Sequence, residues 1–361
     1  MRAALASDRT GKDASGRRGR PVRVMIVDDS LTARAALSRA IEISPGVTVS
    51  GTAGSAEVAL QMLRYTAVDV ILLDLEMPGM GGLTALPRLL EASADAQVLV
   101  VSSLTTAGAE ATLSALALGA ADTLAKPKTG DFNEAYRRGL LDKLLALGGG
   151  IAAPRIPATP NPRRASKAAR PEIIALGAST GGIHALGRFF AALPRTIDVP
   201  IVLTQHLPGS FMPVFARQIA AMSGRSASIA STGDAIAAGT VTIAPGDAHL
   251  LVRRAGNGLV CKLERFDAAS GCCPSVDPML ESIAEAVGAN SVAIVLSGMG
   301  RDGSLGAVHM DRAGGTVLSQ DEASSAVFGM PRGIVEAGIA RAIAPPEELA
   351  DYVARMIAGG A

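Results

Sequence analysis

Residues 173–190 read IIALGASTGGIHALGRFF. An apolar run is followed by a cluster of small residues and then by apolar residues at helical spacing, so this stretch predicts a strand, a tight turn and a helix. Such a turn can cradle a phosphate at the helix N-terminus, or it can hold the hydroxyl of Ser179 out of a sharp bend as a nucleophile. It can also join the two elements without any chemistry. The rest of the chain has to decide among these three interpretations.

The same alternation of strand and helix patterns occurs on both sides of a Pro-rich, basic stretch, GGGIAAPRIPATPNPRRASKAARP. This stretch is typical of an exposed linker, and the alternation predicts two α/β domains. We expect a disordered tail at 1–21, a first domain at 22–147, the linker at 148–171 and a second domain at 172–358. The tail lacks the apolar segment that a secretory signal needs.

The bulk composition excludes several classes of protein. The chain has 361 residues and a net charge of +1, so it is long enough for two domains and has no general attraction to nucleic acid. No window is apolar enough to predict direct insertion into a membrane. The three cysteines include the adjacent pair Cys272–Cys273 and no CxxC spacing. This pattern argues against a disulfide framework and a zinc site, favours a reduced cytoplasm, and suggests that the pair is buried as small hydrophobic residues.

Short apolar runs indicate where the strands lie. In the first half we expect strands at Val22–Val27, Val47–Val49, Val68–Leu73, Val98–Val101 and Thr123–Ala125, with helices at Ser30–Ile43, Ala56–Tyr65 and Ala107–Leu118. In the second half we expect strands at Ile173–Leu176, Ile201–Thr204, Val241–Ala244 and Val292–Leu296, and a hairpin of Leu250–Val252 with Leu259–Leu263. The predicted fold class is α/β with two doubly wound domains. The first is a flavodoxin-like, five-stranded parallel sheet, and the second is a Rossmann-like, mostly parallel domain with a β-hairpin.

Polar side chains follow four of the predicted strands in the first half. Asp28 and Asp29 follow the first strand, and Asp74, Ser102 and Lys126 follow three later ones. The carboxyl ends of parallel strands are where sites form in open α/β sheets. Three carboxylates can hold Mg²⁺, and one of them could attack a phosphoryl group whose charge the metal and the lysine neutralise. A single Asp in such a place is more often a strand end or a helix cap, but five polar groups together favour a site.

This pattern closely resembles the receiver domain of bacterial response regulators. The resemblance implies that Asp74 accepts the phosphoryl group from a histidine kinase and that Asp28 and Asp29 organise Mg²⁺. It further implies a metal-binding backbone carbonyl at Glu76, and phosphoryl contacts from Ser102 and Lys126. Receivers often carry an aromatic residue three positions before the lysine, where this chain has Thr123. The route by which the signal leaves the domain is therefore expected to differ. A DNA-binding output is not expected, because the second half has no concentrated basic helix or evident helix-turn-helix.

The turn at GASTGG fits a nucleophile better than a phosphate loop. It lacks the GxGxxG spacing and the Lys-Ser or Lys-Thr of the Walker loop, but it matches GxSxG with Ser179 at the centre. A serine hydroxyl needs a general base. His206, in TQHLPGSF, directly follows a strand of the same sheet and is the best candidate. His184 and His309 lie in helical runs, where an outward-facing or packed position is the default, and His249 lies in a loop near the site.

A neutral histidine needs a group that orients it, usually a carboxylate. The strand SVAIVLS ends in GMGRDG, which places Asp302 at the same edge of the sheet, in a turn whose backbone N–H groups around Gly298–Gly300 could face an oxyanion. The chain order Ser179, His206, Asp302 differs from that of the α/β-hydrolases, where the acid precedes the histidine. A generic lipase fold is therefore not expected, although the chemistry does not depend on chain order.

The motifs GASTGG, TQHLPGSF, PSVD, LSGMGRDG and SQDEASSAVFGMPR resemble those of the protein-glutamate methylesterases of bacterial chemotaxis, the CheB family. Together with the receiver, the resemblance spans about residues 22–355. It implies Ser179 as nucleophile, His206 as base and Asp302 as orienting acid, with Thr180 and Met299 in or near the oxyanion region. A His-Arg or similar pair is expected before PSVD, where this chain has Cys272 and Cys273.

The resemblance implies a phosphorylation-activated serine hydrolase that demethylates glutamate methyl esters on cytoplasmic parts of methyl-accepting chemoreceptors, and that also deamidates glutamines there. We expect Mg²⁺ in the receiver, no cofactor for the esterase reaction, and a receiver that covers the strand ends of the catalytic half until Asp74 is phosphorylated. Two alternatives stay open. One is a hydrolase of a related pathway that does not control motility, and the other is a non-catalytic regulator that buffers phosphoryl groups.

Overall fold

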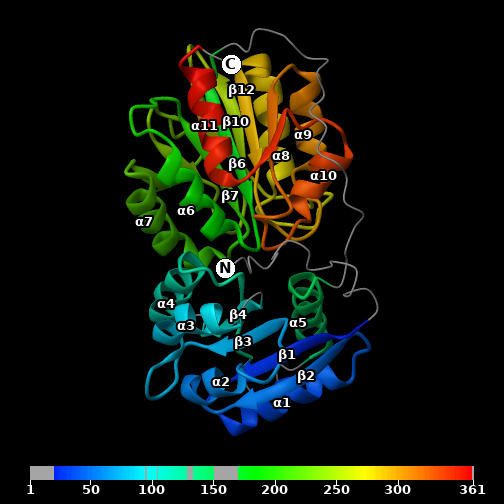
Figure 1. Cartoon of the computed structure of the whole chain (residues 1–361). Coiled ribbons are helices and arrows are strands. Elements are labelled where there is room, and N and C mark those ends of the chain that lie inside the picture. The colour runs from blue at the N-terminus through cyan, green and yellow to red at the C-terminus, as the bar shows by residue number, and fades with distance from the viewer. Residues whose placement is uncertain (1–19, 94–95, 104, 128–132, 150–169, 360–361) are drawn as a thin grey trace, which may run out of the picture.

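The computed structural model describes residues 20–93, 96–103, 105–127, 133–149 and 170–359 (Figure 1). The expected tail at 1–21 and linker at 148–171 lie almost entirely outside these residues. Two α/β units are stacked end to end, with α4 of the first unit (Thr106–Ala117) against α6 of the second (Gly182–Ala192) (Figure 1). No described helix has both the length and the apolar character needed to span a membrane.

The first unit is a five-stranded parallel sheet with the strand order β2-β1-β3-β4-β5. Its strands are β1 (Val22–Val27), β2 (Val47–Ala53), β3 (Val70–Asp74), β4 (Gln97–Ser102) and β5 (Asp122–Ala125). The other helices of this unit are α1 (Leu31–Glu42), α2 (Ala56–Met62), α3 (Gly82–Ala92) and α5 (Glu134–Leu147). This arrangement confirms the predicted flavodoxin-like sheet.

Alternating side chains of the central strands fill two layers, as the two-residue period of a strand requires. In β1, Val24 and Ile26 pack with Leu37 of α1 and Leu140 of α5, whereas Met25 and its alternate neighbours face the layer beneath α2, α3 and α4. Both faces of the sheet are thus covered by helices, which is why β3 is a continuous apolar run before its final aspartate.

The second unit is built on a seven-stranded sheet with the order β14-β13-β12-β6-β7-β9-β8, in which every pair is parallel. Its strands are β6 (Ile173–Ala178), β7 (Ile201–Gln205), β8 (Ala227–Ile229), β9 (Val241–Ile243), β12 (Ser291–Val295), β13 (Thr316–Gln320) and β14 (Ala342–Ala344). The remaining helices are α7 (Met212–Ser223), α8 (Val276–Ala286), α9 (Ser304–Arg312), α10 (Met330–Glu336) and α11 (Pro346–Ile357), with 3₁₀ turns η2 (Gly209–Phe211) and η3 (Gly288–Asn290).

The predicted hairpin is present but longer than expected. Strands β10 (His249–Ala255) and β11 (Gly258–Glu264) pair antiparallel as a separate two-stranded sheet, so the reversal needs only Gly256 and Asn257 rather than the whole of RRAGNG. Sequence analysis did not assign β8, β13 or β14. β8 and β14 have three residues each, which is too short for periodicity to register.

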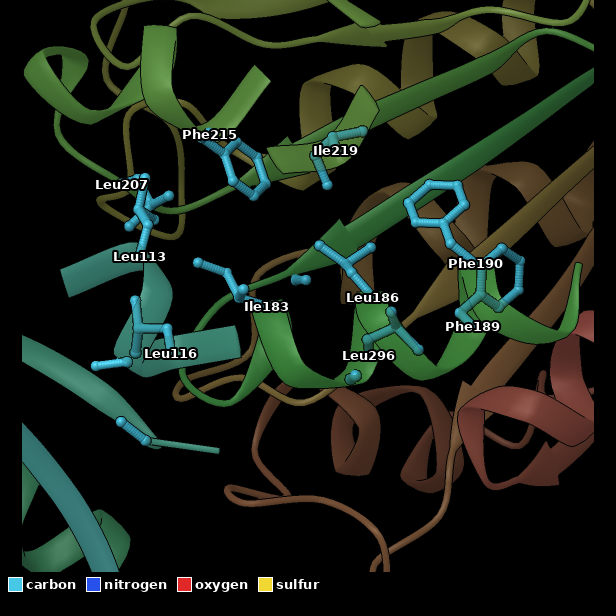
Figure 2. Packing of buried hydrophobic residues seen from close by; sticks show 14 of the residues in the cluster. Leu113, Leu116, Ile183, Leu186, Phe189, Phe190, Leu207, Phe215, Ile219 and Leu296 are labelled. Carbon is cyan, nitrogen blue, oxygen red and sulfur yellow. The ribbon is translucent and has the colours of Figure 1, made fainter. Parts of the chain in front are cut away.

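The apolar core is continuous across the contact between the two units. Figure 2 shows Leu113 and Leu116 of α4 facing Ile183 of α6 and Leu207, which follows β7, and all four residues are buried. Outside this core, an exposed ion pair joins Arg217 to Glu110 at 2.7 Å. An exposed ion pair contributes little to stability. Burial of the leucine and isoleucine side chains therefore supplies most of the free energy that holds the two units together.

Candidate active site and receiver acidic site

Ser179, His206 and Asp302 follow three adjacent strands of the larger sheet. Ser179 directly follows β6 and His206 directly follows β7, whose register pairs Ala178 with Gln205. Asp302 lies in the loop after β12, which pairs with β6 on its other side. The carboxyl ends of neighbouring parallel strands thus bring together three residues that are far apart in the sequence, as the sequence predicts.

The histidine and the aspartate form a buried pair. His206 Nε2 lies 2.7 Å from Asp302 Oδ2, and the side chains are 17% and 1% exposed. Burial opposes a charge on the imidazole, but the hydrogen bond to Asp302 and the neighbouring Cys272 outweigh burial and raise the pKa of His206 to about 9. Burial also opposes the Asp302 charge, yet the donors around that carboxylate lower its pKa.

Asp302 is held by a second segment that sequence analysis treated only as a family motif. Ser275 Oγ donates to Asp302 Oδ1 at 2.6 Å, and the Val276 backbone N–H donates to Asp302 Oδ2 at 2.7 Å. His249, which the sequence placed in a loop, is instead the first residue of β10 and is fully buried. Its Nδ1 accepts a hydrogen bond from the Ser275 backbone N–H, and its Nε2 lies 2.9 Å from the Phe266 carbonyl oxygen. His249 therefore supports the segment that fixes Asp302.

The turn that carries Ser179 is tightly constrained. Gly181 has φ +77°, a left-handed conformation that disfavours other residues, and it precedes α6. A Cβ at Gly298 would lie 2.9 Å from Ser179 Cβ, so only glycine lets the loop after β12 approach the serine this closely. Among the described residues, the Ser179 hydroxyl makes no hydrogen bond, and Ser179 follows the strand that pairs with the strand leading to His206.

Two backbone N–H groups near this turn have no partner among the described residues: that of Thr180, directly after Ser179, and that of Met299, in the loop after β12. Within the described ranges neither N–H donates to a protein acceptor, so both remain available to a ligand. Met299 is 37% exposed, whereas Thr180 is buried. The Thr180 hydroxyl is not available to a ligand in the same way, because it donates to Asp122 Oδ2 of the first unit at 2.5 Å.

The remaining histidines and the cysteine pair differ in how well the sequence predicted their exposure. His184 and His309 are exposed, in agreement with their expected positions. The expectation of buried cysteines was wrong, because Cys272 is partly exposed and Cys273 is exposed. The peptide bond between Cys273 and Pro274, just before the segment that contacts Asp302, is cis. The side chain of Cys272 lies close to His206 and Asp302.

The five predicted polar groups of the first unit also come together. One ligand oxygen from each of Asp28, Asp29 and Asp74 lies within 4.8 Å of the others. Lys126 Nζ lies 2.5 Å from Asp74 Oδ2 and 4.0 Å from Asp28 Oδ2. Burial raises the pKa of Asp74, against the opposing effect of the lysine.

Ser102 lies at the end of β4 and is buried, and its Oγ accepts a hydrogen bond from Thr112 Oγ1 of α4 at 2.6 Å. Glu76 is held in the turn after β3 by its backbone N–H, which donates to Asp74 Oδ1 at 3.0 Å. Three carboxylates beside a lysine form a donor set of hard oxygen ligands with one nearby cation. This set fits Mg²⁺, which prefers carboxylate and carbonyl oxygens.

The fold and these two sites define a response-regulator receiver joined to an α/β domain with the side chains of a serine hydrolase. A family model described as CheB methylesterase matches residues 174–353, and one described as response regulator receiver domain matches residues 24–136. The chain belongs to the CheB methylesterase family.

The similarity to other proteins extends over nearly the whole chain. It is 42% identical over 92% of its length to protein-glutamate methylesterase/protein-glutamine glutaminase 2 of Caulobacter vibrioides, and it covers 98% of that protein. It is 38% identical over 96% of its length to protein-glutamate methylesterase/protein-glutamine glutaminase 1 of Rhodospirillum rubrum, again covering 98% of the relative. A protein-glutamate methylesterase/protein-glutamine glutaminase 2 of Pseudomonas aeruginosa is 41% identical over 91% of this chain, which covers 95% of that protein.

Proposed function

We propose that this protein is a cytoplasmic, phosphorylation-controlled protein-glutamate methylesterase that hydrolyses glutamate methyl esters on chemoreceptors during chemotactic adaptation. The observation that carries the proposal is the unpaired Ser179 hydroxyl at the same edge of the sheet as the buried His206–Asp302 pair, in a chain that covers 98% of a relative with that enzyme name. The same site would deamidate glutamine, because a primary amide differs from the methyl ester only in its leaving group.

The arrangement supports acyl transfer through Ser179. With Nε2 turned to Asp302, Nδ1 of His206 is the nitrogen that can accept the Ser179 proton. Ser179 Oγ attacks the ester carbonyl, His206 returns the proton to the departing methoxide, and methanol leaves. Water, deprotonated by His206, then hydrolyses the acyl-enzyme and restores glutamate. Hydrogen bonds of this kind often close only in the substrate complex, which accounts for the open Ser179.

Two further features would stabilise the transition state. The free N–H groups of Thr180 and Met299 would bind the oxyanion of the tetrahedral intermediate. Asp302 would stabilise the imidazolium that forms, and the donors from Ser275 and Val276 would keep that carboxylate ionised and in place. Each of these contributions is commonly worth roughly 10²-fold or more in rate.

The raised pKa of His206 predicts an alkaline pH profile. A general base must be neutral, and a histidine with a pKa of about 9 is mostly protonated at pH 7. We expect kcat/KM of the unphosphorylated enzyme to rise about tenfold per pH unit from pH 7 and to level above about pH 9. Initial rates of methanol release, corrected with the Ser179→Ala variant for spontaneous ester hydrolysis, would measure this. A profile already level at pH 7.5 would contradict the expectation.

For the receiver we propose Asp74 as phosphoacceptor, with a histidine kinase as donor. Asp28, Asp29, Asp74 and the backbone carbonyl of Glu76 would hold Mg²⁺, which supplies charge neutralisation during phosphoryl transfer. Lys126, already paired with Asp74, would move its ammonium to the phosphoryl oxygens, and Ser102 would donate to one of them. The Ser102 hydroxyl can keep the hydrogen bond that it accepts from Thr112 while its own O–H donates to the phosphoryl group, which would link that group to α4.

The proposed regulation rests on direct contacts between the receiver and the nucleophile turn. Asp122 accepts the Thr180 hydroxyl at 2.5 Å, and the Ala121 carbonyl accepts the Gly181 N–H at 2.6 Å. The receiver thus contacts Thr180 and Gly181, the two residues that directly follow Ser179. A receiver docked in this way would limit access of a receptor helix to the serine, and phosphorylation would act by favouring a second arrangement.

Two physical links connect the acidic site to this contact. β5 carries Asp122 at its start and ends at Ala125, next to Lys126, so about 13 Å of one strand separates the phosphoryl pocket from the nucleophile turn. Ser102 is bonded to Thr112 of α4, and the next residue, Leu113, packs in the interface core near Leu207. Thr123, which stands where other receivers often have an aromatic residue, lies on β5 directly after Asp122. This position is therefore part of the strand that contacts the nucleophile turn.

Loss of the Asp122 carboxylate is expected to release the catalytic half in part. Asp122 holds both Thr180 and Lys143, the latter at 2.5 Å, and a hydrogen bond to a charged group is worth about 1.5–3 kcal/mol. We expect Asp122→Ala to raise methanol release without phosphodonor several-fold, up to about tenfold, and deletion of residues 1–147 to act in the same direction. Asp142→Ala, which removes an exposed carboxylate of α5, is the matched control. An unchanged basal rate in both altered proteins would exclude occlusion by the receiver.

The proposed function is tested by methanol release from methylated chemoreceptor, with and without a small phosphodonor plus Mg²⁺. We expect stimulation by the phosphodonor in the natural protein and only basal release in Asp74→Asn, because the amide cannot accept the phosphoryl group. Absence of release from the folded, phosphorylated protein would overturn the proposal and favour a phosphoryl-buffering regulator. Release from receptors of a pathway without motility would point to the related chemosensory role.

A further inference from the structure

Three side chains at the active site form a set of metal-ligand atoms that the esterase mechanism does not require. A ring nitrogen of His206, the Sγ of Cys272 and a carboxylate oxygen of Asp302 all lie within 4.8 Å of one another. They come from the loop after β7, the segment before α8 and the loop after β12. The acyl-transfer steps use His206 and Asp302, but no step forms or breaks a bond at the thiol of Cys272.

The dimensions and chemistry of this set suit zinc. Zn²⁺ binds imidazole nitrogen, thiolate and carboxylate oxygen at about 2.0–2.3 Å, so ligand atoms of one tetrahedral site lie roughly 3.5 Å apart. His206 Nε2 and Asp302 Oδ2 are 2.7 Å apart and would need to separate slightly, while atoms up to 4.8 Å apart would need to close. Both are side-chain movements. A thiolate also selects against Mg²⁺, which prefers oxygen.

The surroundings already hold the ligands as a metal site would require. Asp302 accepts hydrogen bonds from Ser275 Oγ and the Val276 N–H, so its orientation is fixed from behind. The Cys272 backbone N–H donates to Ser270 Oγ at 3.3 Å, which holds the turn that carries the thiol. Cys272 and His206 are both partly exposed, and this gives an ion a path from solvent.

We propose that His206, Cys272 and Asp302 bind a zinc ion, and that the bound ion reversibly inhibits the enzyme. The ion replaces the proton between His206 and Asp302 and the proton of the Cys272 thiol, so two protons are released for each Zn²⁺ bound to the protonated site. Three protein ligands leave a fourth position for water. With Nε2 bound to zinc, the imidazole keeps its remaining proton on Nδ1, the nitrogen that would accept the Ser179 proton, so His206 cannot act as the base. The inhibition rests on the proposed function, whereas the binding does not.

The cysteine pair supplies a matched test. The full chain, Cys272→Ser and Cys273→Ser would be titrated with zinc chloride in excess Mg²⁺, which occupies the receiver acids, and methanol release would be followed. We expect the natural protein and Cys273→Ser to be inhibited alike and to recover fully with EDTA. Cys272→Ser, which loses one of three ligands, should need at least about tenfold more zinc for half-inhibition of its own rate.

A second readout is independent of the esterase reaction. Co²⁺ in place of Zn²⁺ should give a thiolate-to-cobalt charge-transfer absorption in the natural protein and in Cys273→Ser, and this band should be absent in Cys272→Ser. Equal zinc sensitivity of the two cysteine variants, or no cobalt band in the natural protein, would overturn the proposal. A cobalt band in a protein that releases no methanol would keep the metal site and reject the proposed function instead.

Discussion

Replacement of Ser179 by alanine is expected to reduce phosphodonor-stimulated methanol release by at least about 10³-fold. The hydroxyl is the atom that would form the acyl-enzyme, and the oxyanion donors alone cannot supply a nucleophile. KM for the receptor should change little, because the change removes one oxygen from a side chain that does not anchor the substrate. Steady-state rates with the natural protein and the variant at equal concentration would measure the loss.

Two controls make the Ser179 result specific. Ser210→Ala removes the hydroxyl of an exposed serine in η2, two residues beyond the loop that starts at His206, and should leave the rate unchanged. Phosphorylation of Asp74 in Ser179→Ala should also be normal, because the receiver site is built from other residues. A Ser179→Ala protein that retained a tenth of the natural rate would show that this serine is not the nucleophile.

The second large effect is expected for Asp302→Asn, which should lower kcat by roughly 10³–10⁴-fold. The carboxylate accepts from His206 Nε2 at 2.7 Å, and an amide can present an N–H there and force the imidazole into the wrong tautomer. The hydrogen bond from Ser275 to the same side chain would keep the amide in place, so the fold should survive.

The pH profile separates this loss from misfolding. The Asp302 charge raises the pKa of His206, so its removal lowers that pKa and moves the residual activity toward lower pH. Asp351→Asn, on the exposed side of α11, is the control with the same chemical change. A residual profile that still rises toward pH 9 would mean that Asp302 does not set the ionisation of the histidine.

The sequence predicts the sheets and the strand-end residues well because both depend on short-range pattern. The strand at Val22–Val27 has the bounds that its apolar run suggests, and Ser179 and His206 follow their strands as the motifs indicate. Parallel strands place their carboxyl ends on one edge, so a residue that directly follows a strand can be assigned to that edge without knowledge of the packing.

What sequence analysis missed depends on contacts between distant segments. The bond from Thr180 to Asp122 joins the two units, and no local pattern signals the partner of a buried threonine hydroxyl. His249 was placed in the loop APGDAHLLV, yet β10 begins at the histidine itself. The absence of CxxC spacing argued against zinc, but Cys272 meets His206 and Asp302 only through tertiary folding.

The contact between β5 and the nucleophile turn also bears on how freely the two halves could be recombined. The Ala121 carbonyl accepts from the backbone N–H at position 181, which every residue except proline supplies, whereas the Asp122 carboxylate needs a side-chain donor such as the Thr180 hydroxyl. A chimaera with a receiver from another response regulator would bring its own residue to the start of the fifth strand. Under the proposed regulation, such a chimaera would accept phosphate normally and still leave the hydrolase unregulated, so receiver and hydrolase would be a matched pair rather than interchangeable modules.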